Sequence, residues 1–295
     1  MSNNAFPAPL VGQTVAVFDS SLDKSNAVTT PLGAELTAHD WLAAEVPVAL
    51  VFNGISHAVM MATPQDLDLF ALGFALSEGI VDSASEVRGI EASLADAQLS
   101  KLPTGVAALE VHIEISARCF EQLKNHRRTL AGRTGCGVCG VDSLAALDLL
   151  SLPVAWQEWV NQVDAPTVLH AFAQLEPLQV LNAESGALHA AAWATLNGTL
   201  LHAFEDVGRH NALDKLIGKL AQTKQLGLPG FVILSSRGSH ELVRKCARVG
   251  LAAMATISAP TSMAVQMARL SGVRLWGLCR SPRAVLYWDG KGAVP

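Results

Sequence analysis

Two pairs of apolar runs, each split by an Asn-Gly dipeptide, form the clearest pattern along the chain. The runs are 46–52 and 55–61, split by Asn53-Gly54, and 190–196 and 199–204, split by Asn197-Gly198. Asn and Gly tolerate the positive backbone angles that a two-residue hairpin turn requires. We therefore predict two antiparallel β-hairpins.

Apolar runs and helical patterns alternate after the second hairpin. The predicted strands are 231–235, 251–257 and 273–278, and the predicted helices are 208–222, 239–249 and 262–270. This alternation indicates parallel strands with helices packed on the sheet, while the hairpins add antiparallel neighbours. The expected fold class is α/β, as a three-layer sandwich built on a mixed sheet.

The N-terminal half has a less regular pattern. Residues up to about Asp40 suggest a loosely ordered lead-in with a strand at 14–18. Thr63 is followed by proline, so a helix capped by Thr63 is expected to run to about Ser77. The other elements expected in this region and just beyond it are a strand at 106–115 and helices after Asp142 and Asp164.

A weakly marked boundary between 151 and 164 divides the chain into two subdomains that we expect to pack closely, as parts of one domain or as two. Residues 1–150 hold the first hairpin and a cysteine-containing loop. Residues 151–295 hold the second hairpin and the alternating strands and helices. No repeat of fixed period supports a different division.

The composition narrows the class of protein. The 295 residues are 50% hydrophobic and only 16% charged, which excludes a disordered chain and allows a sizeable core. A formal net charge of −5 argues against a general nucleic-acid binder, which usually carries a basic surface. The five cysteines, an odd number, do not indicate a disulfide framework, so a reducing cytoplasm is expected.

The uncharged stretch 249–268 is nearly long enough to cross a membrane, but Pro260 and several polar residues interrupt it. We interpret it as a buried strand, a turn, and a helix capped at Thr261 or Ser262. The N-terminus shows no basic segment followed by an apolar run, so no signal peptide is predicted. A soluble cytoplasmic protein is expected.

The most informative loop is 131–140, in which Cys136 and Cys139 have CxxC spacing among four glycines. Arg127, Arg128 and Arg133 lie close by in the sequence, and positive charge favours the reactive thiolate. Two thiols at this spacing have three alternative roles: they form half of a zinc site, they cycle between dithiol and disulfide, or they carry sulfur. The residues alone leave these three alternatives open.

Two other signatures on or near this loop are weak. The loop matches GxGxxG, but no hydrophobic strand precedes it, as a dinucleotide site requires. His112 and Glu114 before the CxxC echo zinc nucleoside deaminases, but Gly135 stands where that pattern has proline. Alternation also places His112 and Glu114 on the exposed face of a strand.

A structural zinc site needs four ligands, and the sequence has no second CxxC to complete one. Cys119, Cys246 and Cys279 are isolated in the sequence and are expected to be buried.

Polar residues gather where predicted strands end. Residues 204–215 contain either a helix cap by Asp206 with exposed charges on an amphipathic helix, or part of a ligand site. Similar junctions follow at 234–241 and 258–262, and Arg280 and Arg283 follow the last predicted strand. If these strand ends share one edge of the sheet, their helix N-termini and arginines suit a phosphorylated ligand such as a nucleotide-bearing cofactor.

Taken in order, these motifs resemble the formate dehydrogenase accessory sulfurtransferases, the FdhD/NarQ family. The residues that carry the resemblance are Thr63-Pro64, Gly73, Ser77-Glu78-Gly79, Cys136 and Cys139, His189, 205–215, Ser236-Arg237, 258–262 and Arg280. The resemblance covers most of the chain. It implies a cytidine-deaminase-like fold and a homodimer.

The resemblance also implies a function. The family takes sulfur as a persulfide from a cysteine desulfurase and passes it to the bis-guanine-dinucleotide molybdenum cofactor of formate dehydrogenase. By this pattern Cys136 is the persulfide carrier and Cys139 a second thiol, with no metal site. The stretch that resembles the family's cofactor-binding segment is Leu278, Cys279, Arg280, Ser281, Pro282 and Arg283. The alternative functions are a molybdenum-cofactor chaperone without sulfur chemistry and a zinc hydrolase of the deaminase type.

Overall fold

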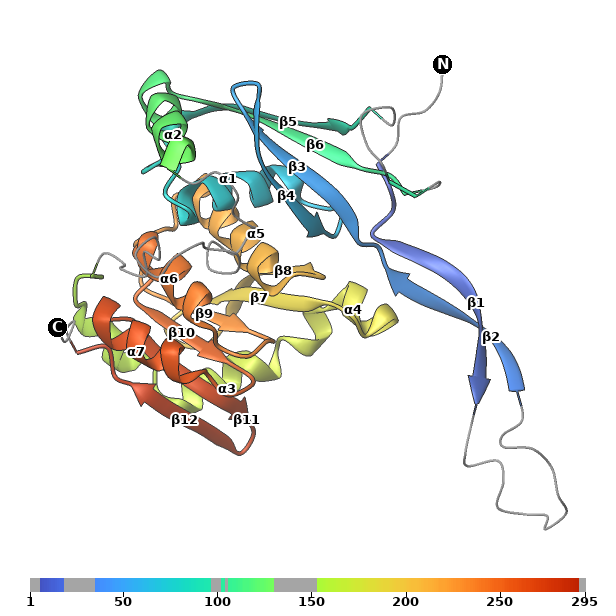
Figure 1. Cartoon of the computed structure of the whole chain (residues 1–295). Helices are drawn as coiled ribbons and strands as arrows, with labels where there is room; N and C mark the ends of the chain where they lie inside the picture. The colour runs from blue at the N-terminus through green and yellow to red at the C-terminus, as the bar shows by residue number, and fades with distance from the viewer. Residues whose placement is uncertain (1–5, 19–34, 97–101, 104–105, 130–152, 292–295) are drawn as a thin grey trace, which may run out of the picture.

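The computed structural model describes residues 6–18, 35–96, 102–103, 106–129 and 153–291, and within these the strands form three sheets (Figure 1). The first sheet is a two-stranded ribbon of β1 (Leu10–Phe18) and β2 (Glu35–Ala43). The second has the order β4–β3–β6–β5, and the third has the order β12–β11–β10–β9–β7–β8.

The four-stranded sheet contains the first predicted hairpin. Its strands are β3 (Val46–Phe52), β4 (Ile55–Ala62), β5 (Val87–Leu94) and β6 (Leu109–Ile115). Strands β3 and β4 are antiparallel, and Asn53 and Gly54 take φ angles of 45° and 80° in the turn. The hairpin prediction is confirmed, because both turn residues adopt the left-handed backbone that Asn and Gly permit.

The six-stranded sheet contains the second predicted hairpin, β7 and β8, and the alternating part of the chain. Its strands are β7 (His189–Ala194), β8 (Leu200–Asp206), β9 (Phe231–Leu234), β10 (Ala253–Thr256), β11 (Arg274–Arg280) and β12 (Arg283–Trp288). Strand β10 pairs in parallel with both β9 and β11, whereas β7 runs antiparallel to both β8 and β9. Strands β8 to β11 therefore all run in one direction.

The α-helices are α1 (Leu67–Ser77), α2 (Ala117–Thr129), α3 (Ala165–Ala173), α4 (Val180–Ser185), α5 (Arg209–Gln222), α6 (His240–Arg248) and α7 (Ser262–Ser271). Helices α1 and α5 lie between the two large sheets, α6 and α7 pack on the same face of the larger sheet as α5, and α3 packs on its far face (Figure 1). Short 3-10 turns lie at Ala84–Glu86, Glu158–Gln162 and Glu176–Leu178.

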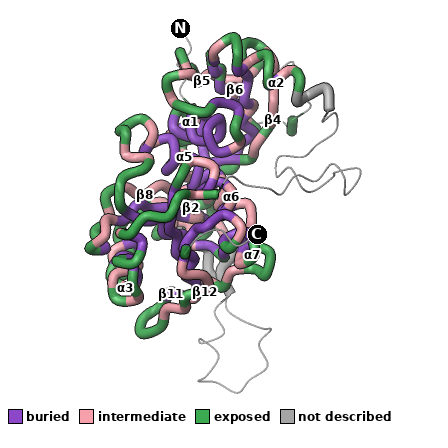
Figure 2. Tube along the Cα trace, turned by 90° about the vertical axis from the view of Figure 1, so that its left-hand side faces the viewer, coloured by how far each residue is buried: buried purple, intermediate pink, exposed green. Residues whose placement is uncertain are grey.

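Both faces of the six-stranded sheet are buried. Trp193 and Val232 belong to a large apolar cluster with α1, α5, α6 and α7, while their neighbours Ala192 and Ile233 belong to a second cluster with α3. This alternation follows from the two-residue period of a strand. Figure 2 shows the buried residues of these layers in purple. The predicted α/β sandwich with a mixed sheet is confirmed.

Helices α1 and α5 cross in close contact because each has a glycine at the crossing. A Cβ on Gly73 would lie 1.7 Å from the carbonyl oxygen of Asp214, and one on Gly218 would lie 2.0 Å from the carbonyl oxygen of Leu69. Since α1 lies in the N-terminal half and α5 in the C-terminal half, one apolar cluster spans both. The division into 1–150 and 151–295 stays a prediction.

Several sequence-based expectations were wrong in detail. The strand predicted at 14–18 is part of β1, but the rest of the lead-in before Asp40 was expected to be loosely ordered and contains the remainder of β1 and most of β2. Thr63 does not cap α1, whose N-cap is Asp66, because the Thr63 side chain is engaged elsewhere. The stretch 249–268 is a strand, a turn and a helix capped by Thr261, as predicted. None of the described helices is long and apolar enough to cross a membrane.

Candidate functional site

The carboxyl ends of β8, β9, β10 and β11 meet at one edge of the six-stranded sheet, as the sequence pattern predicted. Each of β8, β9 and β10 leads into a helix there, α5, α6 and α7 respectively. His189 begins β7 beside the end of β8, opposite Asp206 in the register. The loops are joined by backbone hydrogen bonds, since Thr261 donates to Gly238 and Leu278 donates to Ser258. We call this region the strand-end edge.

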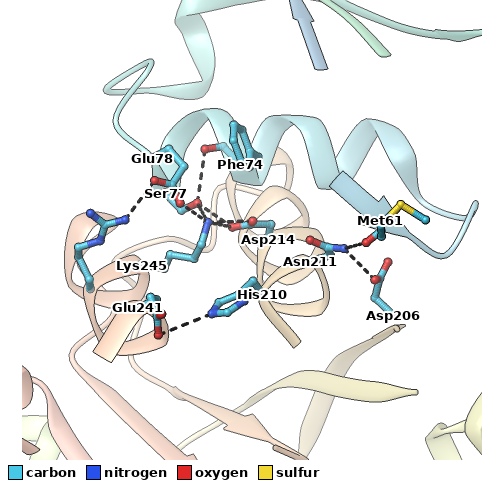
Figure 3. Close-up of polar contacts among 11 residues, drawn as sticks. Met61, Phe74, Ser77, Glu78, Asp206, His210, Asn211, Asp214, Glu241 and Lys245 are labelled. Carbon is cyan, nitrogen blue, oxygen red and sulfur yellow. Dashed lines mark hydrogen bonds and ion pairs between the residues drawn. The ribbon is translucent and has the colours of Figure 1, made fainter. Parts of the chain in front are cut away.

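Asp206, at the end of β8, has no exposed surface and organises the turn into α5. Its carboxylate accepts hydrogen bonds from the backbone of Thr63 and Gly208 and from the side chain of Asn211, and it pairs with the Lys215 ammonium at 2.8 Å. The Asn211 amide also donates to the carbonyl of Met61 (Figure 3). Asp206 thus joins the end of β4 to the start of α5.

The interpretation of 204–215 as a capped helix with exposed charges is wrong. The α5 N-cap is Gly208, and Asp206, Asp214 and Lys215 are all buried. Glu205 accepts hydrogen bonds from the backbone of Leu181 and Asn182 at the start of α4. The ionisable residues of this segment therefore position neighbouring elements rather than face the solvent.

A second buried charge cluster connects α1, α5 and α6 (Figure 3). The Lys245 ammonium contacts Asp214 at 2.9 Å and Glu78 at 2.7 Å. Burial alone lowers the pKa of Lys245, but these two carboxylates outweigh it and raise this pKa above its ordinary value. Burial raises the pKa of Glu78, but Lys245 and Arg244 bring it below its usual range. Lys245 and Glu78 are therefore charged at neutral pH, whereas burial raises the pKa of Asp214 above its ordinary value.

Histidines and Glu241 lie at the strand-end edge beside this cluster. The Glu241 carboxylate is 3.8 Å from Nε2 of His210 and 3.5 Å from Nδ1 of His240. His210 more than any other group holds the pKa of Glu241 well below its usual range. Burial, reinforced by the Arg209 guanidinium, lowers the pKa of His189, so this imidazole is neutral at pH 7.

Four buried side-chain polar atoms at this edge have no hydrogen-bond partner among the described residues. They lie at the N-termini of α5 and α6 and are Nε of Arg209, Nε2 of His210, Oγ of Ser239 and Nε2 of His240. Buried polar atoms in native proteins nearly always have partners, so such atoms indicate a polar ligand. Helix N-termini favour anions. The edge therefore has the chemistry of an anion-binding site.

The predicted cofactor-binding stretch is the end of β11 and the turn into β12. Arg280, Ser281, Pro282 and Arg283 are exposed there, and the Ser281–Pro282 peptide is cis. Leu278 is half-buried with a φ of 53°, a backbone conformation that leucine rarely adopts. The pairing of β11 with β12 is irregular between Gly277 and Arg280. A left-handed backbone conformation at a residue such as Leu278 tends to occur at ligand sites.

The described cysteines are unreactive. Cys119, Cys246 and Cys279 are all buried, as predicted, and burial raises the pKa of Cys246 and Cys279 to about 12. Burial also raises the pKa of the Cys119 thiol. Within the predicted cofactor-binding stretch, the side chain of Cys279 therefore faces the core rather than a ligand.

The two cysteines singled out by their CxxC spacing, Cys136 and Cys139, lie outside the described residues. So does the helix predicted after Asp142. His112 and Glu114, in contrast, lie on β6 with their side chains on its exposed face, as the alternation predicted. Among the described residues, no group of three histidine, cysteine or carboxylate side chains is arranged to hold a metal ion.

Sequence reasoning missed Lys245, although its signal is present. It follows Leu242 by three positions and precedes Cys246 by one, which places a lysine on the apolar face of α6. A lysine on such a face needs a buried partner. Glu241 and His240 were noted only as part of a helix start.

The fold and the strand-end edge define an α/β protein in which unpartnered polar groups and helix N-termini gather at the carboxyl ends of parallel strands. Residues 43–292 match the model of the FdhD/NarQ family, so the chain belongs to that family. A protein of Burkholderia mallei named "Sulfur carrier protein FdhD" is 51% identical over 251 residues, which cover 85% of this chain and 89% of the relative. A protein of the same name from Chromobacterium violaceum is 51% identical over 89% of this chain and 94% of its own.

A solved structure has the same fold. It is a crystal structure from Desulfotalea psychrophila described as a formate dehydrogenase accessory protein, with a TM-score of 0.63. The match covers 94% of this chain and 96% of that chain at 21% sequence identity. The two chains therefore share the arrangement of their helices and strands, although only 21% of the aligned residues are identical.

Proposed function

We propose that this protein carries sulfur as a persulfide on Cys136, from a cysteine desulfurase to the bis-guanine-dinucleotide molybdenum cofactor used by formate dehydrogenase. The observation that carries the proposal is the 51% identity to relatives named sulfur carrier proteins. In the first step the Cys136 thiolate attacks the terminal sulfur of the donor persulfide. The donor sulfur–sulfur bond breaks, and the donor cysteine leaves as a thiolate, so no external oxidant or reductant is needed.

The state of the other thiols supports this assignment. Of the five cysteines, Cys119, Cys246 and Cys279 are buried with raised pKa values, which suppress the thiolate that attacks sulfur. The remaining two are Cys136 and Cys139. We assign Cys136 as the carrier and Cys139 as the second thiol.

The strand-end edge suits the acceptor, which is the substrate of the second half of the reaction. A guanine dinucleotide carries phosphates, and Arg280 and Arg283 are exposed at the end of β11 to pair with them. The unpartnered Nε donor of Arg209 suits the same anionic substrate. We propose that the protein works as a homodimer in the cytoplasm and delivers the sulfurated cofactor to formate dehydrogenase.

The first test is the intact mass after incubation with a cysteine desulfurase and cysteine. We expect a gain of about 32 Da, one sulfur atom, in the wild type and in Cys279→Ala, and no gain in Cys136→Ala. A gain that persists in Cys136→Ala refutes the assignment. If Cys136→Ala also supports full maturation of formate dehydrogenase, the chaperone alternative is correct instead.

The second test uses GDP as a probe of the strand-end edge. We expect Arg280→Ala and Arg283→Ala each to weaken GDP binding about tenfold or more, because each removes a charge-assisted hydrogen bond. The matched control is Arg118→Ala, an exposed arginine on α2. Equal affinities for all three variants would contradict a phosphate site at the end of β11.

A further inference from the structure

Helices α5 and α6 face one another through two layers of ionisable side chains (Figure 3). In the inner layer, Asp214 on α5 contacts the ammonium of Lys245 on α6 at 2.9 Å, and both side chains are buried. The outer layer lies one helical turn closer to the strand-end edge, where Nε2 of His210 is 3.8 Å from Oε2 of Glu241. The charge of this outer pair depends on whether the imidazole has taken up a second proton.

Glu241 differs in its partners from the other carboxylates of this region. Asp206 and Glu78 each pair with a lysine. Among the ion pairs of the described residues, Glu241 pairs only with imidazoles, those of His210 and His240. Its side chain is 16% exposed, and His210 holds its pKa well below the usual range, so it is ionised at neutral pH. Its negative charge is therefore fully compensated only when a neighbouring histidine is protonated.

Every described element that packs around His210 contributes ionisable groups. The groups are Glu78 on α1, His189 on β7, Asp206 on β8, Arg209 and Asp214 on α5, and His240, Glu241, Arg244 and Lys245 on α6. The buried pairs described above compensate their own charges. His189 is neutral at pH 7, since burial lowers its pKa. The Glu241 carboxylate and the Arg209 guanidinium are therefore the charges that remain for a ligand beside His210.

Unpartnered polar atoms next to the outer pair indicate such a ligand. Nε of Arg209 and Oγ of Ser239 are buried and have no hydrogen-bond partner within the described ranges, and Ser239 is only 5% exposed. They lie beside His210 and Glu241 in the chain, at the N-termini of two helices, where free backbone N–H groups attract anions. An anion that binds there is repelled by Glu241 unless His210 carries a proton. Anion binding and proton uptake therefore favour one another.

We infer that His210 is a proton-coupled binding residue for the phosphates of the substrate, which bind at the N-termini of α5 and α6 together with one proton on this imidazole. Glu241 is its positioning residue, because the carboxylate faces Nε2 and stabilises the imidazolium. The inference rests on the phosphate site of the proposed function. It adds a histidine, a residue type that titrates near neutral pH, to Arg280 and Arg283, which do not titrate there.

The test is the affinity for GDP, measured by isothermal titration calorimetry between about pH 6 and about pH 8. We expect the wild-type affinity to fall about tenfold or more across this range, whereas His210→Gln binds GDP weakly and with little pH dependence, because glutamine takes up no proton. The terminal phosphate of GDP itself titrates near about pH 6, and comparing variants removes this effect. The matched control is His112→Gln, which removes the exposed histidine beside Glu110 on β6 and should keep the wild-type profile. A profile of His210→Gln as steep as that of the wild type overturns the inference.

A second measurement needs no substitution. The heat of GDP binding at about pH 7.5, compared between buffers of different ionisation enthalpy, gives the number of protons that the complex takes up. We expect a net uptake of up to about one proton in the wild type. Glu241→Gln should take up fewer protons, because it no longer stabilises the imidazolium. No uptake in the wild type overturns the inference.

The outcomes separate this inference from the proposed function. Arg280→Ala should weaken GDP binding by the same factor at every pH, because it removes an arginine and leaves the coupled proton in place. GDP binding without proton uptake refutes the role of His210 and leaves the phosphate site intact, whereas the absence of GDP binding at every pH refutes both. The gain of about 32 Da on Cys136 tests the sulfur carrier independently of either result.

Discussion

Replacing Gly73 with alanine tests the close crossing of α1 and α5. The new Cβ would lie 1.7 Å from the carbonyl oxygen of Asp214 and 2.6 Å from its carbonyl carbon, both backbone atoms that no side-chain rotation can move. To regain normal contact distances, α1 has to move away from α5 by roughly 1.5 Å. Overpacking of this kind costs about 3 kcal/mol or more, and the better helix propensity of alanine returns about 1 kcal/mol.

The expected net loss is therefore at least about 2 kcal/mol of unfolding free energy, or a melting temperature lower by about 4–8 °C. The assay is urea unfolding followed by circular dichroism, with a thermal melt. Gly89→Ala on β5 is the matched control, because the nearest atom to its new Cβ is a carboxylate oxygen 3.8 Å away. If Gly73→Ala unfolds at the same urea concentration as Gly89→Ala, the helices are not held by this contact and the reasoning fails.

Three further predictions concern buried charge, protonation and capping. Lys245→Met should cost about 3–5 kcal/mol in urea unfolding, because it leaves the buried Asp214 carboxylate unpaired, and adding Asp214→Asn should recover part of that loss. The pKa of His189 is lowered on folding, so the unfolded chain binds its proton more readily, and stability falls as pH drops below the ordinary value of 6.5. His189→Gln should lose less stability between pH 7 and pH 5, and an identical pH profile would contradict this. Thr261→Ala should cost about 1 kcal/mol by removing the α7 cap, while Thr261→Ser should cost little.

The sequence predicts those parts of the fold that depend on neighbouring residues. Both hairpins are where the Asn-Gly dipeptides predicted them. In the first, both turn residues take the left-handed backbone, whereas in the second only Gly198 does and the loop 195–199 is longer than the predicted two-residue turn. Asp164 caps α3 through the backbone of Thr167, a bond between residues three apart. The meeting of four strand ends at one edge was also predictable, since parallel strands joined by helices leave no other arrangement.

The strand-end edge shows what sequence reasoning misses. Asp206 was expected to cap a helix, but its partner Thr63 is 143 residues away in the chain. Lys245 pairs with Asp214 from a position 31 residues further on, and its other partner, Ser77, is 168 residues away. Local pattern assigns a charge to the surface by default, because charges are rarely buried without a partner. A partner so distant in sequence becomes visible only when α1, α5 and α6 are seen together.

The ribbon shows the opposite error. Its alternating apolar positions are typical of a strand, and the strand predicted at 14–18 lies within β1, but the partner strand β2 was not predicted. Sequence interpretation assumes that an apolar face is buried by its own chain. Val11, Trp41 and Leu42 do not follow that assumption in the described chain, since each is more than two-fifths exposed. The alternation of apolar positions therefore predicts the strand itself, but it does not predict which surface covers the ribbon.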